Sequence, residues 1–239
     1  MATFVMVHGA FGGGWQWGPV ARLLRDRGHE VSTPSLTGHG ERIHLATSAT
    51  GLETHIEDIC NVLLYQDLHA VILVCQSYGG MVVSGVADRL PERLAHLVYL
   101  NALVPADGQA AFDLLPAPMR QHFEAGARSA IDGWRVPVPP LEDDPRVAAF
   151  ARGRFVPSPL RMFTDPLQLG PPPDLPRTFI WCTEDPAGLA GVADLMQPFA
   201  QRARDDPAWK SRQLAAPPDA MIHMPGAVAD LLEEAARSR

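Results

Sequence analysis

Lysine is almost absent from this sequence of 239 residues, and cysteine is scarce. Lys210 is the only lysine, whereas arginine, alanine and proline are abundant, a composition that indicates a GC-rich bacterial genome. The three cysteines, Cys60, Cys75 and Cys182, are odd in number, lack the spacing of metal ligands and lie in apolar surroundings. We therefore expect reduced thiols in the interior of a cytoplasmic protein, and no metal site.

Long apolar runs are also missing. No segment is apolar for long enough to span a bilayer, and nothing of signal-peptide character precedes the first predicted strand. The formal net charge of -7 is spread along the chain rather than gathered in a tail. This distribution argues against nucleic acid or a membrane as partner and favours a small-molecule substrate. The sequence leaves a homodimer open.

Apolar segments of strand length alternate with segments of helical periodicity from the start of the chain. This alternation predicts an α/β fold, in which a mostly parallel sheet has crossover helices on both faces. Residues 71–74 and 97–100 are continuously apolar, which places them in the middle of the sheet. The six predicted strands are residues 2–7, 30–33, 70–75, 95–101, 177–182 and 210–215.

The alternation of predicted strands and helices is interrupted between Pro105 and about Leu175. This stretch is rich in proline and contains short helical pieces. We interpret residues 105–175 as a cap inserted after the fourth strand, over the carboxyl ends of the strands, where open α/β sheets bind ligands. Residues 1–104 and 176–239 then form the core of a single domain.

Ser77 lies between a buried strand and a helix, in the segment VCQSYGG of residues 74–80. This context is that of the G-x-S-x-G nucleophile elbow, where the residues two before and two after the serine must be small. Gly79 meets this requirement, and Cys75 is compact enough to replace the other glycine. The pattern predicts that Ser77 occupies the position of a nucleophile.

A glycine-rich turn of sequence HGAFGGGW, residues 8–15, follows the first predicted strand. Such a turn can direct one backbone N–H into a pocket, and the N–H after the nucleophile supplies a second, which together form an oxyanion hole. We assign this role to Ala10 and Tyr78. The glycines lack the spacing of dinucleotide-binding and P-loop motifs, so we expect no nucleotide cofactor.

These motifs resemble those of the α/β-hydrolase superfamily, in particular the plant methylesterases, the hydroxynitrile lyases and their bacterial esterase relatives. The resemblance extends over nearly the whole chain through HGAF (8–11), SYGGM (77–81), YLNALVP (99–105), DGW (132–134) and CTED (182–185). It implies the α/β-hydrolase fold, no metal or organic cofactor, and a catalytic triad of Ser, Asp and His in chain order. Asp185 matches the acid of this triad.

The sequence departs from the family at the catalytic histidine. In the bacterial members that the chain resembles, the catalytic histidine is followed by Asp-Pro-Met. Here Pro218 stands at the position of that histidine, and Asp219 follows it. Asp219 also corresponds to the lysine of hydroxynitrile lyases, which disfavours cyanohydrin cleavage. A serine hydroxyl needs an adjacent base, and subtilisin loses about 10⁶ in kcat without its histidine. His223, downstream, and His122, in the cap, are the candidates for a relocated base.

Three functions follow from these residues. The first is non-hydrolytic chemistry, such as cyclisation, elimination or isomerisation, on a small ester, lactone or polyketide-like compound of specialised metabolism, with Asp185, Ser77 or a cap residue moving protons. The second is a carboxylesterase or lactonase with a relocated base, and the third is a catalytically inactive binding protein. The residues expected to line the substrate pocket are Phe11, Trp15, His122, Phe123 and Trp134.

Overall fold

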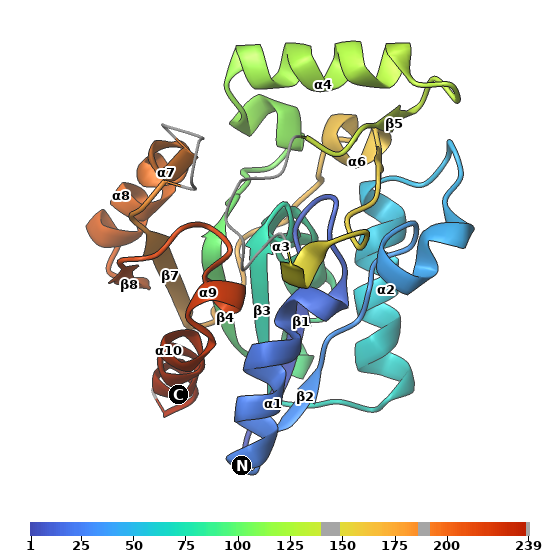
Figure 1. Cartoon of the computed structure of the whole chain (residues 1–239). Helices are drawn as coiled ribbons and strands as arrows, with labels where there is room; N and C mark the ends of the chain where they lie inside the picture. The colour runs from blue at the N-terminus through green and yellow to red at the C-terminus, as the bar shows by residue number, and fades with distance from the viewer. Residues whose placement is uncertain (140–148, 186–191, 238–239) are drawn as a thin grey trace.

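A computed structural model describes residues 1–139, 149–185 and 192–237 (Figure 1). Six strands form one parallel sheet in the order β2-β1-β3-β4-β7-β8, which confirms the predicted fold class. The central strands β3 and β4 are buried over almost their whole length, as their continuous apolar character predicts. The strands are β1 (Thr3–Val7), β2 (Glu30–Ser32), β3 (Val71–Ser77), β4 (Leu94–Ala102), β7 (Arg177–Cys182) and β8 (Trp209–Leu214).

Helices cover both faces of the sheet because alternate strand residues point to opposite sides. Phe4, Met6 and Val74 pack with apolar residues of α1 and α10 on one face. Val5, Val7 and their neighbours pack with α2, α3 and α8 on the other. These helices are α1 (Gly18–Asp26), α2 (Leu52–Tyr65), α3 (Gly79–Arg89), α8 (Gln197–Asp205) and α10 (Pro225–Arg237). In the part of the chain that the structure describes, no helix is long and apolar enough to cross a membrane.

Shorter elements surround the carboxyl ends of the strands. The long α4 lies across this end of the molecule, and the small antiparallel pair β5-β6 and α6 lie near it (Figure 1). All four belong to the segment interpreted as a cap, of which residues 140–148 lie outside the described ranges; its status as a separate unit stays an interpretation. Other elements of the described chain are η1 (Gly14–Trp17), η2 (Gly40–Leu45), η4 (Ala111–Leu114), α4 (Ala117–Ser129), β5 (Arg135–Val136), β6 (Ser158–Pro159), α6 (Arg161–Thr164), α7 (Val192–Leu195), α9 (Ala220–His223) and η3 (Pro91–Arg93), which precedes β4 at its amino end.

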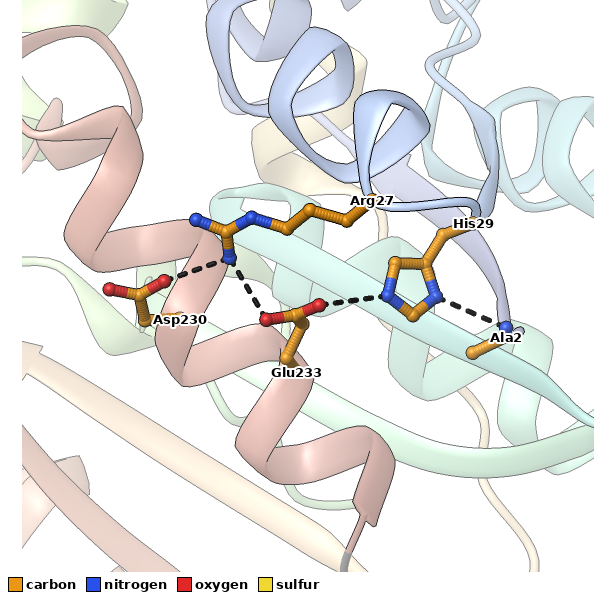
Figure 2. Close-up of polar contacts among 5 residues, drawn as sticks. All are labelled: Ala2, Arg27, His29, Asp230 and Glu233. Atoms are coloured by element: carbon orange, nitrogen blue, oxygen red, sulfur yellow. Dashed lines mark hydrogen bonds and ion pairs between the residues drawn. The ribbon is translucent and has the colours of Figure 1, made fainter.

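A cluster of polar contacts fastens α10 to the start of the chain (Figure 2). Arg27 lies 2.8 Å from a carboxylate oxygen of Asp230 and 2.9 Å from one of Glu233. The Ala2 N–H donates to His29 Nδ1 at 3.1 Å, so Nε2 carries the proton and donates to Glu233 at 3.0 Å. The hydrogen bond from His29 and the charge of Arg27 lower the pKa of Glu233. Exposed ion pairs contribute little to the free energy of unfolding. We therefore infer that this cluster orients α10 rather than adding much to the stability of the fold.

Candidate active site

Ser77 is the last residue of β3 and adopts a positive φ of 51°. This left-handed backbone is the sharp strand-to-helix turn expected of a nucleophile elbow. A Cβ on Gly79 would lie 2.9 Å from the His8 carbonyl oxygen and 3.3 Å from Cys75 Cβ, so only glycine fits. Cys75 is completely buried in this junction, and burial raises the pKa of its thiol, which leaves Ser77 as the side chain available for chemistry.

Two backbone N–H groups lie at the cavity that contains Ser77. Ala10 and Tyr78 both line it, and neither N–H has an acceptor among the described residues. The turn next to Ala10 is fixed by a distant segment: Phe11, with φ of 63°, donates its N–H to Ser158 Oγ at 2.9 Å. Val156 donates its N–H to the Phe11 carbonyl at 2.9 Å. Two N–H donors without partners, held rigidly beside the serine, are the arrangement that an oxyanion hole requires.

His8 supports this turn from the interior. Its Nε2 accepts the Leu36 N–H at 3.0 Å, so Nδ1 carries the proton and donates to the Gly9 carbonyl at 2.7 Å. Burial lowers the pKa of His8 to about 4. With both ring nitrogens bonded and the ring neutral, His8 has a structural role.

His39 and His55 continue a row of buried imidazoles, with ring centroids 5.4 Å apart. His55 Nδ1 accepts the Tyr78 hydroxyl at 2.9 Å, while its Nε2 donates to the Thr37 carbonyl at 3.0 Å. His39 Nε2 pairs with Ser158 Oγ at 3.0 Å. Burial lowers the pKa of His39, and that of His55 to about 4. None of these rings lines the cavity at Ser77, so none is placed to take the serine proton.

The cavity itself has a volume of about 220 Å³, smaller than the roughly 300–1,000 Å³ of sites for drug-sized ligands. Apolar side chains of the segment after β4, including Phe123 of α4 and Phe163 of α6, form much of its wall. Its polar lining residues are Gln16, Gln76, Ser77, Asn101 and Asp219. A small, mostly apolar ligand with a few polar atoms would fit this lining.

The predicted pocket residues are only partly brought together. Phe11 and Phe123 line the cavity, whereas Trp15, His122 and Trp134 do not. Trp15 packs instead on Phe150 and Phe155, and the Trp134 ring lies against the Arg135 guanidinium at 5.0 Å. His122 is exposed, because it precedes the inward-facing Phe123 on α4 and successive helical residues point about 100° apart.

The residues predicted to complete a triad are also not assembled around Ser77. Asp185 follows β7, is exposed, and accepts the Ala193 N–H at 2.8 Å. His223 is the last residue of α9. Neither lines the cavity, so of the three residues given catalytic roles from the sequence only Ser77 does.

Asp219 is the residue that sequence reasoning missed. It lines the cavity with Ser77, directly after Pro218, whose carbonyl accepts the Gln76 amide at 3.5 Å. Desolvation raises the pKa of the Asp219 carboxyl, and the charge of His223 partly opposes this shift. No donor among the described residues bonds its carboxylate, although Asp219 is the N-cap of α9. Its place in the sequence, beside the missing histidine, was the available signal.

A second cavity, of about 310 Å³, lies between α3, the middle of β4 and the starts of β7 and β8. Ser84, Tyr99 and Trp209 contribute to its wall. The Ser84 hydroxyl is bonded to the Gly80 carbonyl at 2.8 Å and to the Tyr99 hydroxyl at 3.0 Å. We place the active site at the smaller cavity because that one combines a strained serine, two N–H donors with no acceptor in the described ranges and a carboxylate.

Comparison with known proteins identifies the family of the chain. The model of the Alpha/beta hydrolase family matches residues 4–231. The chain belongs to this family. It is 34% identical to a carbendazim hydrolyzing esterase of Nocardioides sp. (strain SG-4G), over 97% of this chain and 98% of the relative. It is 35% identical to putative methylesterase 12 of Arabidopsis thaliana, over 46% of this chain and 32% of that protein.

The solved structures agree on the fold. An extracellular alpha/beta-hydrolase from a Paenibacillus species superposes with a TM-score of 0.81 at 22% identity, over 98% of this chain and 99% of that one. The relatives are esterases and hydrolases, which supports an enzyme of the α/β-hydrolase type.

Proposed function

We propose that the protein is an enzyme that acts on a small carbonyl compound by proton transfer, in a cyclisation, elimination or isomerisation, without an acyl-serine intermediate. One observation supports this proposal above all others. The cavity combines Ser77 and the N–H groups of Ala10 and Tyr78 with the Asp219 carboxylate, and its described lining contains no imidazole.

In this proposal the substrate carbonyl oxygen accepts hydrogen bonds from the Ala10 and Tyr78 N–H groups. These donors stabilise the negative charge that develops on the oxygen when a neighbouring C–H bond loses its proton. Ser77 keeps its own proton, because the described lining contains no imidazole to accept it and a serine hydroxyl that is not deprotonated is a weak nucleophile. The hydroxyl then serves as a hydrogen-bond donor to the substrate.

Ester hydrolysis is the second candidate, favoured by the 34% identity to an esterase over almost the whole chain. It would need a base for Ser77. His122 is exposed on α4, and His223 lies outside the lining but four residues from Asp219 on the same short helix. His223 is therefore the better placed of the two predicted relocated bases.

Intact-mass spectrometry after incubation with a small fluorophosphonate separates the two candidates. We expect no covalent adduct on the wild-type protein, or on the Ser77→Ala and His223→Ala variants. Stoichiometric labelling that requires Ser77 would contradict the proposal and establish an activated serine, and its loss in His223→Ala would identify the base. Tight ligand binding without any product would instead favour an inactive binding protein.

A further inference from the structure

The Asp219 carboxylate is the strongest base that the described cavity lining offers. It lines the same cavity as Ser77, no donor among the described residues bonds it, and the surrounding protein desolvates it. Desolvation makes a carboxylate a better proton acceptor, because it disfavours the charged form. Carboxylates in clefts with such perturbed ionisation are frequently catalytic.

Two carboxamides at the same cavity have polar atoms to spare. Asn101 is 2% exposed and its Oδ1 accepts the Cys182 N–H at 3.2 Å, so the NH₂ group is its remaining polar group. That NH₂ has no acceptor among the described residues. Gln16 is 3% exposed, and its Oε1, an acceptor, has no donor among the described residues. A buried polar group left without a hydrogen bond costs about 1–3 kcal/mol. An acceptor atom of a ligand would remove this cost at the Asn101 NH₂, whereas Gln16 Oε1 needs an O–H or N–H donor.

The hydrogen-bond donors of the cavity wall therefore include the backbone N–H groups of Ala10 and Tyr78 and the Asn101 amide, and the Asp219 carboxylate lines the same cavity. Ala10 and Tyr78 can bind one carbonyl oxygen, and the Asn101 amide can bind another acceptor. A ligand that matches this set has two carbonyl oxygens and an acidic C–H between them. The apolar remainder of the lining suits alkyl or aryl substituents on such a compound.

We infer that Asp219 is the catalytic base of the proposed reaction and that the substrate is a 1,3-dicarbonyl compound, such as a β-keto ester. The inference rests on the proposed function and extends it to a substrate class and a base. The residue contacts the reacting C–H directly.

The step balances without any co-reactant. The Asp219 carboxylate takes the proton from the carbon between the two carbonyls, and the electron pair of the broken C–H bond forms the enolate. The negative charge moves to the oxygen held by the Ala10 and Tyr78 N–H groups. Asp219, now a neutral acid, returns its proton to carbon or to a leaving group.

Ethyl 2-methylacetoacetate in D₂O tests this inference and the proposed function in one sample. Proton NMR follows the loss of the C2–H signal, which reports enolate formation, and the release of ethanol, which reports ester hydrolysis. We expect the wild-type protein to accelerate C2 exchange over the protein-free rate. Asp219→Asn should lower the catalysed exchange by about 10²–10⁴-fold, the usual contribution of a general base.

One control variant is matched to this change: Asp174→Asn removes an exposed carboxylate outside both cavities and should exchange at the wild-type rate. Ser77→Ala is not a control, because it removes a proposed hydrogen bond to the substrate; it should lower exchange by up to about tenfold, less than Asp219→Asn. If Asp219→Asn fails to fold, the pH dependence of the wild-type protein tests whether Asp219 is the base. The rate of catalysed C2 exchange must then fall at low pH, as Asp219 becomes protonated. Asp219→Ala should in addition regain exchange when formate is added.

The outcomes separate the two claims. Wild-type exchange no faster than the protein-free rate overturns the substrate class. Accelerated exchange that Asp219→Asn leaves unchanged overturns the role of Asp219 but supports proton transfer as the function. Ethanol release that depends on Ser77 and not on Asp219 overturns the proposed function itself.

Discussion

The buried histidines and the cavity carboxylate differ in how their polar atoms are satisfied. Both ring nitrogens of His8 and of His55 are hydrogen-bonded, and burial holds the pKa of each near 4. Asp219 has no donor on its carboxylate within the described chain, and burial raises its pKa. The number of histidines near Ser77 therefore does not indicate that one of them is catalytic. In this chain His8 and His55 are structural, whereas the cavity carboxylate has no bonded donor among the described residues.

The most direct way to break the comparison is to return an imidazole to the cavity. Pro218 lines the same cavity as Ser77, so we expect Pro218→His to bring a base within reach of the hydroxyl. We expect hydrolysis of p-nitrophenyl acetate to rise by about 10²–10⁴-fold, the range of general-base catalysis. Pro218→Ala and the double variant with Ser77→Ala should show no gain. If Pro218→His hydrolyses p-nitrophenyl acetate no faster than Pro218→Ala, residue 218 is not the position of the missing catalytic histidine.

The buried histidines should make stability depend on pH. Each of His8 and His55 has a folded pKa of about 4 against 6.5 unfolded, so the unfolded chain binds more protons between these values. Stability is therefore full above pH 6.5 and lost as pH falls toward 4, by about 2 kcal/mol for each histidine at pH 5. Urea unfolding at pH 7.5, 6 and 5 measures the slope. His55→Phe should flatten it, whereas the exposed His122→Ala should not.

Ser158 links the two regions, since its hydroxyl contacts both the Phe11 N–H and His39. Ser158→Ala should cost about 1–3 kcal/mol in urea unfolding and also reduce the catalysed C2 exchange, because the oxyanion turn loses its anchor. Ser84→Ala is the matched control: it removes a hydroxyl bonded to Gly80 and Tyr99, away from that turn. Equal exchange rates in the two variants would argue against the anchoring role.

His122→Ala should have the smallest effect. The side chain is exposed and outside the cavity, so we expect a stability change within about 0.5 kcal/mol. C2 exchange should stay within about twofold of the wild-type rate. A tenfold or larger loss of exchange would restore His122 as a candidate base and contradict the placement of α4.

Local patterns were sufficient for the sheet and for the serine turn. The continuously apolar residues 71–74 and 97–100 lie in the two central strands, as predicted. Strand β3 extends two residues beyond the predicted end at 75, because the ladder continues into the turn at Ser77. Ala10 and Tyr78 could be assigned from short motifs, although the turn next to Ala10 is held by the distant Ser158 and Val156.

Long-range packing determines which of the predicted pocket residues face the cavity and how Asp219 ionises. Whether Trp15, His122 or Trp134 faces the cavity depends on how the segment after β4 folds back, and the sequence contains no local signal for this. Asp219 was interpreted only by what it replaces in hydroxynitrile lyases. Its chemical character comes from desolvation, which arises when β3, the turn at Ala10 and α9 come together.

The hydrogen bond from Phe11 to Ser158 joins residues 147 positions apart. Chains are synthesised from the amino terminus, and their early segments begin to fold before later ones exist. A nascent chain that has emerged as far as α3 therefore contains the whole serine turn, yet the Ser158 hydroxyl that holds the neighbouring loop has not been made. The turn at Ala10 thus gains its Ser158 anchor only after about two thirds of this sequence has left the ribosome, and Asp219 follows later still.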